Sequence, residues 1–371
     1  MCYYNIIIIG YYGLVCEKTE KPHPMEREIM NNRPFFLTDY WNKMAAEHKP
    51  LLSYKNNDLP FGEWKKEALP KLLELLGEFP EKAPLDPVIE YSVDQGDYVR
   101  QRVVFNTEAG MACPAFVLIP KSAEKGHRTP AIVCSHGHGP FGKAPVAGVR
   151  SEAAYDAEIA KMNYNYAEQM AKAGYVTIAP DLRGFGERRE ELELYGRDLC
   201  NINFLKGALF GIYPLTLNIH DIKCCIDYLE TMPEVDADRI GMMGLSYGGT
   251  MTTFATAVEP RIKAADIIGY VNSFAAFAVG NSNFCGSQMV PNLYKYFDTY
   301  DVAGMIAPRP LLIEMGIYDN CFKFEDLYAG FEEVKRIYNA AGVGDKLFSD
   351  MHPHGHAFSG AKAFDFFREN L

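Results

Sequence analysis

The sequence predicts an α/β fold built on a mostly parallel sheet with helices on both faces. From Ala131 to the C-terminus, short apolar runs alternate with segments of helical length, which is typical of parallel strands joined by crossover helices. The run 131–134 (A-I-V-C) is apolar at every position, as expected for a strand buried on both faces. Three earlier runs at 88–93, 98–106 and 111–119, separated by turn residues, predict antiparallel strands at the N-terminal edge of that sheet.

The chain is expected to contain a main domain and an N-terminal extension. Its 371 residues, 48% hydrophobic and 23% charged, suffice for one large α/β domain with additions. Residues 1–85 predict a helical extension that packs on the main domain, because no Gly/Ser-rich linker separates the two. Residues 86–371 then form the main domain.

Helical and strand patterns can be assigned in order along the chain. The segment F-G-E-W-K-K-E-A-L-P-K-L-L-E-L-L predicts a helix over 61–76 that ends at Gly77 and that Pro70 could split. Later strands are expected at 131–134, 175–179, 240–245, 264–269, 310–316 and 347–351. The helices between them are expected at 164–173, 215–232 and 324–341, with a terminal helix that starts near Ala357.

The charge of the chain argues against nucleic acid and membrane as main partners. The net charge is −11, the sequence pI is near 5.4, and no run of Lys or Arg is present. The nine cysteines are an odd number without the spacing of a disulfide framework, which favours a reducing, cytoplasmic compartment. The expected partner is a small molecule, and a homo-oligomer is compatible with the sequence.

The N-terminus is open to three interpretations. Residues 1–16 are apolar and aromatic but have no basic region, no A-x-A cleavage motif and too few residues to span a bilayer. They are therefore a poor signal peptide, although secretion stays an alternative. The segment could instead be an early strand, or translation could start at Met25 or Met30.

A nucleophile is predicted at Ser246. The motif Gly244-Leu-Ser-Tyr-Gly248 follows an apolar run and precedes a plausible helix, which is the strand–turn–helix context of a G-x-S-x-G nucleophile elbow. Such a turn leaves room only for small residues two positions before and after the serine. The serine would then stand at a helix N-terminus, where positive partial charge favours a developing oxyanion.

A base and an orienting acid are expected after the last two strands, in the order serine, acid, histidine. Asp319 follows the strand 310–316, and His356 follows the strand 347–351. Asp326 and, less favourably, Glu314 are the alternative acids. His354 and His352 are the alternative bases.

The oxyanion donors are expected to be backbone N–H groups. One belongs to Tyr247, directly after the nucleophile. The second should come from the glycine-rich loop after the first buried parallel strand, S-H-G-H-G-P-F-G at 135–142, as the N–H of His138 or Gly137.

Two long connections, 139–163 and 270–303, predict cap-like insertions. They carry many aromatic residues, which disfavours disorder and suggests walls of a substrate pocket. The alternative is additional core, and whether 270–303 opens as a lid is left open. The candidate pocket residues are His136, Phe141, Phe277 and Phe284.

Two further patterns are interpreted as structural. Arg183, in D-L-R-G-F-G-E-R, is expected to brace loops near the site by pairing with Asp181 or Glu187. The histidine clusters 136/138 and 352/354/356 have metal-compatible spacing, but a hydrolytic zinc site usually adds a carboxylate or cysteine ligand. We therefore expect no metal and no cofactor.

The assembled motifs resemble the α/β-hydrolase superfamily, and within it the dienelactone-hydrolase-like and acetyl-xylan-esterase-like group of bacterial esterases. The matching motifs are H-G-H-G at 136–139, D-L-R-G-F-G at 181–186, G-L-S-Y-G-G at 244–249, I-A-P-R-P-L-L at 306–312 with Asp319, and H-G-H-A-F at 354–358. From about Val88 to the C-terminus, the resemblance implies an α/β-hydrolase fold and a serine carboxylic-ester hydrolase that forms an acyl-enzyme without a cofactor.

The resemblance also has two departures that bear on the substrate. Ser246 stands where dienelactone hydrolase has cysteine, which argues against the lactone reaction. The sequence R-G-F-G replaces the R-G-Q-G type of acetyl xylan esterases, so sugar deacetylation stays open. Small to medium esters, including acetylated carbohydrate or plant-derived esters, are expected. A peptidase of the same fold and a catalytically silent binding protein are the alternatives.

Overall fold

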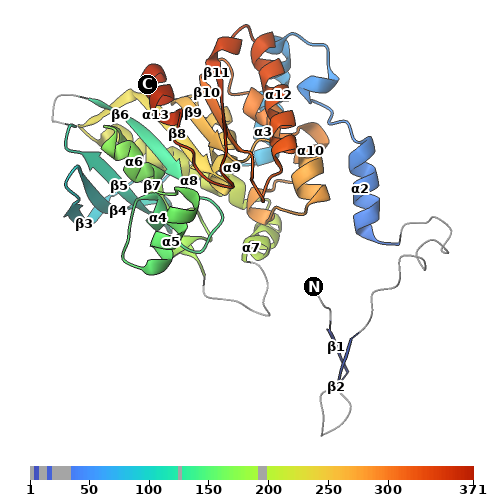
Figure 1. Ribbon diagram of the computed structural model, residues 1–371, viewed down its shortest axis with the longest axis horizontal. Helices are drawn as coiled ribbons and strands as arrows, with labels where there is room; N and C mark the ends of the chain where they lie inside the picture. Colours follow the sequence, from blue (N-terminus) through green and yellow to red (C-terminus); the bar gives the residue numbers. More distant parts are fainter. Residues whose placement is uncertain (1–3, 8–14, 19–34, 124–127, 191–198) are drawn as a thin grey trace. The chain divides into compact units, whose positions relative to one another are not determined.

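The computed structural model describes residues 4–7, 15–18, 35–123, 128–190 and 199–371 (Figure 1). The chain divides into two compact units, 1–47 and 48–371. In the first unit, β1 (Tyr4–Ile7) and β2 (Val15–Lys18) pair antiparallel, and α2 (Leu37–Glu47) follows. Most of the apolar stretch 1–16, together with Met25 and Met30, lies outside the described residues.

The second unit contains a nine-stranded sheet with the order β11-β10-β9-β8-β6-β7-β5-β4-β3. The strands from β11 to β7 run parallel, whereas β5, β4 and β3 continue the sheet antiparallel. This arrangement confirms the predicted fold class. The strand bounds are β3 (Val88–Asp94), β4 (Tyr98–Glu108), β5 (Met111–Pro120), β6 (Thr129–Ser135), β7 (Val176–Pro180), β8 (Val235–Leu245), β9 (Ile262–Ile268), β10 (Leu311–Gly316) and β11 (Leu347–His352).

Helices cover both faces of the sheet because alternate strand residues enter two separate apolar cores. In β6, Val133 packs in one core, and its neighbours Ile132 and Cys134 pack in the other. The larger core includes α3 (Phe61–Leu76), α8 (Pro214–Thr231), α9 (Tyr247–Val258), α11 (Thr299–Gly304) and α12 (Phe324–Ala340). The smaller core includes α4 (Lys143–Val146), α6 (Tyr166–Lys172) and α13 (Ala363–Asn370).

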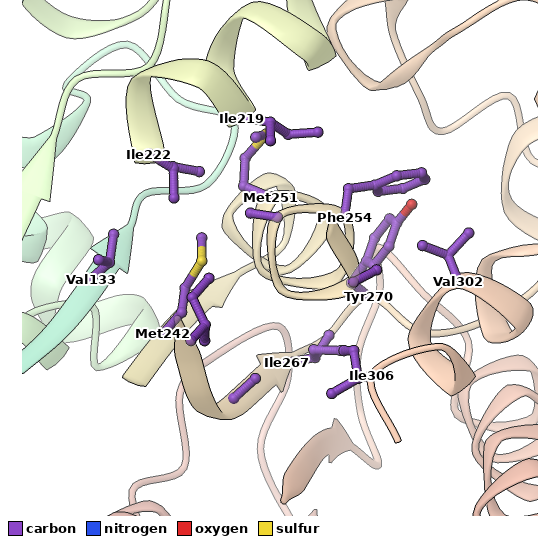
Figure 2. Packing of buried hydrophobic residues seen from close by; sticks show 14 of the residues in the cluster. Val133, Ile219, Ile222, Met242, Met251, Phe254, Ile267, Tyr270, Val302 and Ile306 are labelled. Carbon is purple, nitrogen blue, oxygen red and sulfur yellow. The ribbon is translucent and has the colours of Figure 1, made fainter. Parts of the chain in front are cut away.

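Helix α9 packs against both the sheet and α8. Figure 2 shows Met251 and Phe254 of this helix among side chains from β6, β8, β9 and α8, including Met242 and Ile219. These residues are fully buried. The helix that follows the predicted nucleophile is therefore fixed by packing on two sides.

The remaining elements are short or irregular. The helices are α5 (Ala153–Met162), α7 (Leu199–Ala208) and α10 (Leu293–Tyr296), with a π-helix, η4 (Phe274–Gly280), and short 3₁₀ turns η1 (Tyr54–Asn56), η2 (Gly186–Arg188), η5 (Gly286–Gln288) and η6 (Gly344–Lys346). Most of them lie in the two long connections and in the 181–213 region. Among the residues that the structure describes, no helix is both long and apolar enough to cross a bilayer.

Two expectations about helices had different outcomes. The helix at 61–76 is continuous through Pro70, which lies at an exposed position. The terminal helix does not start near Ala357 but at Ala363. The N–H groups of Phe358 and Ser359 are bound instead by Met162 O and the Glu314 carboxylate, which holds this segment as a loop.

Candidate active site

Ser246 lies on a sharp turn between β8 and α9, as predicted for an elbow. Its φ of 63° and ψ of −116° are unusual for a residue with a side chain, and such strain costs on the order of 1–3 kcal/mol. A Cβ atom on Gly248 would lie 2.1 Å from Ser135 O, and one on Gly244 would lie 2.6 Å from the backbone of Gly248. Both glycines are therefore required by close backbone approach.

Asp319 and His356 are joined by a hydrogen bond. His356 Nδ1 lies 2.7 Å from Asp319 Oδ2, and Asp319 Oδ1 accepts the backbone N–H groups of Cys321 at 2.7 Å and Phe322 at 2.9 Å. These two backbone bonds fix the carboxylate, which in turn orients the imidazole. With Nδ1 as donor, Nε2 is the acceptor nitrogen of the ring. It is buried and has no hydrogen-bond partner within the described part of the chain.

The alternative acids and bases lie at other positions in the fold. Glu314 lies within β10, and its Oε2 accepts the N–H of Ser359 at 2.7 Å. Burial raises the pKa of Glu314 to about 8. Asp326 lies in the first turn of α12. His352 is buried, which lowers the pKa of its imidazole, and its ring packs against that of His354.

Ser246 and His356 line one cavity of about 610 Å³. This volume lies within the range of small-molecule sites. The wall is mixed in character and comes from α5, the irregular segment before α10, and the loop after β10. Its other lining residues are His138, Glu158, Lys161, Met162, Ser282, Asn283, Phe284, Cys285, Gln288, Tyr318, Asn320, Cys321, Phe322 and Gly355.

The predicted oxyanion loop passes beside Ser246. A Cβ atom on Gly137 would lie 3.3 Å from Ser246 Cβ. The N–H of Gly137 donates to the hydroxyl of Tyr164, which favours His138 as the source of the second oxyanion donor. Tyr247 starts α9, and its buried hydroxyl donates to Ser287 O at 3.1 Å and accepts from Asn218 Nδ2 at 2.9 Å. These bonds anchor the residue after the nucleophile.

Of the four candidate pocket residues, Phe284 alone is among those that line the described cavity. His136 is buried, its Nε2 accepts the N–H of Leu182 at 3.0 Å, and its Nδ1 contacts Gly137 O at 2.7 Å. Phe141 packs edge-on against Tyr155, and Phe277 is fully buried in the larger core. For Phe277 the structure agrees with the alternative of additional core.

Arg183 braces two elements, but not through the predicted acids. Its guanidinium makes paired hydrogen bonds to Asp221, at 2.9 and 2.6 Å, and to Glu108, at 3.0 and 3.1 Å. Asp181 and Glu187 bind Lys143 instead. The pairing with Asp181 or Glu187 is therefore wrong. The true partners lie on α8 and β4, which proximity along the sequence could not indicate.

Sequence reasoning missed a group of sulfur and nitrogen atoms at the cavity. His138 Nε2 lies 3.3 Å from Cys200 Sγ, and Cys285 Sγ lies 2.8 Å from Ser287 Oγ. The pKa of the Cys285 thiol is lowered to about 5, mainly by a hydrogen bond with Cys200 and then by contacts with His138 and Ser287. The two cysteines are far apart in sequence, so no spacing motif could have indicated their proximity.

Comparison with known proteins identifies the family. Residues 36–356 match the model of the Abhydrolase family. A protein of Bacillus subtilis (strain 168) named "Putative hydrolase YtaP" is 26% identical over 283 residues, which are 76% of this chain and 90% of that protein.

Two solved structures have a similar fold. One, from Bacteroides fragilis NCTC 9343, is described as "a putative acetyl xylan esterase (BF1801)". It has a TM-score of 0.71 and 19% identity and covers 87% of this chain and 84% of its own. A glucuronoyl esterase from Solibacter usitatus has a TM-score of 0.62 and 15% identity, and the match covers 86% of this chain and 97% of that esterase chain. The resemblance to the α/β-hydrolase superfamily is thus confirmed: the fold is the α/β-hydrolase fold, and the chain belongs to the Abhydrolase family.

Proposed function

We propose that the protein is a serine carboxylic-ester hydrolase with Ser246 as nucleophile, His356 as base and Asp319 as the orienting acid. One observation carries this proposal. The 2.7 Å hydrogen bond from His356 Nδ1 to Asp319 leaves Nε2 of the ring as a proton acceptor in the cavity that Ser246 also lines. The strained backbone of Ser246 supports the same role.

The chemistry follows from these positions. His356 Nε2 takes the proton of Ser246 as Oγ attacks the ester carbonyl. The N–H groups of Tyr247 and His138 stabilise the tetrahedral oxyanion, and such donors contribute on the order of 3 kcal/mol each. The alcohol leaves with the proton from His356. Water, deprotonated by the same imidazole, then releases the acid and frees Ser246.

The cavity supports small to medium esters with polar groups, such as esters of carbohydrates. Amides and charged groups of Asn283, Gln288, Asn320 and Lys161 line it together with aromatic rings. Convergent polar groups of this kind select hydroxylated ligands. The names of the similar structures, an acetyl xylan esterase and a glucuronoyl esterase, support the same class.

The test compares wild type with Ser246→Ala on p-nitrophenyl acetate, butyrate and octanoate and on acetylated xylo-oligosaccharides. We expect the variant to lose about 10⁴-fold or more in kcat, because the nucleophile is absent. Ser92→Ala, which changes an exposed serine on the edge strand β3, is the control and should match wild type. Covalent labelling by a fluorophosphonate should occur in wild type and in Ser92→Ala alone. Equal labelling of Ser246→Ala, or a folded wild type that neither reacts nor hydrolyses any of these esters, would contradict the proposal.

A further inference from the structure

We propose that His138, Cys200 and Cys285 form a binding site for a thiophilic divalent metal ion, and that Zn²⁺ is the preferred ion. The three potential ligand atoms, one imidazole nitrogen and two sulfurs, all lie within 4.8 Å of one another. They come from three separate segments: the loop after β6, the start of α7, and the segment before η5. The tertiary fold therefore assembles this donor set.

The spacing of His138 and Cys200 fits tetrahedral coordination. Zn–N and Zn–S bonds of about 2.05 and 2.3 Å at tetrahedral angles place the nitrogen about 3.5 Å from a sulfur and two sulfurs about 3.8 Å apart. The distance from His138 Nε2 to Cys200 Sγ is 3.3 Å. The pair thus needs an adjustment of only a few tenths of an ångström to hold the ion, which is less than a change of rotamer would produce.

The donor set also fits the chemistry of the ion. Two thiolates and one imidazole are ligands that Zn²⁺ prefers, and a site with three protein ligands keeps a fourth position open for water or another ligand. Each thiol loses its proton to solvent as its sulfur–metal bond forms, so that two thiolates balance the charge of the ion. His138 and Cys285 line the cavity, which gives the open position access to a small molecule.

A second group of possible ligands lies in the same cavity but is a poorer site. Asp319, Cys321 and His356 also lie within 4.8 Å of one another. However, Asp319 is held by two backbone N–H groups and binds His356, so a metal there would break the contact that orients this imidazole. Cys321 is exposed, whereas Cys200 and Cys285 are each 8% exposed. The partly desolvated cysteine pair is the better ligand environment.

The test uses the full chain, reduced with a phosphine and freed of metal by a chelator. Titration with Co²⁺, a spectroscopic substitute for Zn²⁺, should saturate at one equivalent with a strong thiolate-to-metal charge-transfer absorption that Zn²⁺ then abolishes. Cys200→Ser and Cys285→Ser should each weaken Co²⁺ binding by more than about tenfold and reduce that absorption. Cys321→Ser is the matched control and should bind Co²⁺ as wild type does. Circular dichroism verifies that each variant is folded.

Three results would overturn the proposal. Folded wild type could show no charge-transfer absorption at any Co²⁺ concentration. The absorption could be lost in Cys321→Ser and kept in the other two variants, which assigns the ion to the second group. Mass spectrometry could find a Cys200–Cys285 disulfide in protein isolated without reductant, with no Co²⁺ bound after reduction. None of these results depends on ester hydrolysis, so the experiment tests the metal site independently of the proposed function.

Discussion

The nucleophile elbow and the wall of the cavity are built by opposite means. At the elbow, the backbones of Gly244, Gly248 and Ser135 touch, and α9 is buried on two sides. Much of the wall comes from irregular segments around 282–288 and 318–322, where exposed side chains such as Asn283 and Asn320 alternate with buried ones such as Phe322. Backbone contact leaves one geometry for the reacting group, whereas side chains on loops can be exchanged without moving the sheet. We therefore expect elbow and base variants to affect every substrate, and wall variants to change the preference among substrates.

Asp319→Asn should have the largest effect. The side-chain oxygen of asparagine can still accept the N–H groups of Cys321 and Phe322, so the loop should hold. The amide would favour the wrong tautomer of His356, which lowers kcat by about 10⁴-fold in the serine protease precedent. Steady-state rates on all p-nitrophenyl esters should fall together. The control is Asp326→Asn, on α12, which should stay near wild type. Comparable losses in the two variants would contradict the assignment of the acid.

Gly248→Ala should follow in size. The added methyl group would lie 2.1 Å from Ser135 O, so β6 and the elbow must separate. A displacement of about 1 Å costs on the order of 10²-fold in rate, and overpacking costs about 1–3 kcal/mol of stability. The control is Gly62→Ala, at a helical position where an added Cβ atom would meet nothing within 4 Å. This variant should keep wild-type activity, and its melting temperature should equal or slightly exceed that of wild type. A Gly248→Ala enzyme with wild-type kcat would show that the elbow tolerates movement.

Phe284→Ala should alter preference rather than rate. The side chain lines the cavity and is partly buried against the larger core. Its removal enlarges the space for the acyl or alcohol group, so the ratio of kcat/KM for octanoate over acetate should rise by about tenfold. The matched comparison is Phe141→Ala, which lies off the described lining and should leave that ratio unchanged. If Phe284→Ala lowered kcat/KM equally for all three esters, Phe284 would act on the reaction itself and not on the choice of substrate.

Glu314→Gln should have the smallest effect, which appears in the pH dependence of stability. Burial raises the pKa of Glu314 in the folded chain to about 8 from an ordinary value near 4.5. The folded state therefore binds this proton more tightly than the unfolded state, and stability falls as pH rises from about 4.5 to 8. The glutamine variant can still accept the N–H of Ser359, so it should gain in melting temperature relative to wild type between pH 6 and 8. A difference in melting temperature between the variant and wild type that does not change with pH would contradict the raised pKa of Glu314.

Sequence patterns predicted the parts of the site that depend on local geometry. Ser246, Asp319 and His356 each follow a strand that the sequence predicts, and parallel strands bring their carboxyl ends to one edge. The assignment of their catalytic roles stays a prediction. His136 was expected to line the pocket, but it is buried and contacts backbone groups. The neighbouring residues in the sequence do not distinguish a buried histidine of this kind from one that lines a pocket.

Contacts between distant segments could not be predicted. Arg183 pairs with Asp221 and Glu108 rather than with nearby acids, and the thiols of Cys200 and Cys285 lie within 4.8 Å of each other. Such pairs depend on which distant segments the fold brings together. Side-chain packing determines this, whereas the spacing of hydrophobic residues along the sequence does not reveal it. The loop before α13 illustrates the same point, since tertiary hydrogen bonds overrode a helical pattern there.

The strand order has a consequence for biosynthesis. The chain completes β8 and the elbow long before β11 and His356 are synthesised, and β11 lies at the outer edge of the described sheet, where it pairs with β10. A nascent chain that ends before residue 347 can therefore hold a formed elbow next to β6 and β9 without the base that would activate it. With the proposed roles of Ser246 and His356, reactivity would begin only when the last strand docks, so that an incomplete chain, still exposing apolar surface to its surroundings, would carry no active serine.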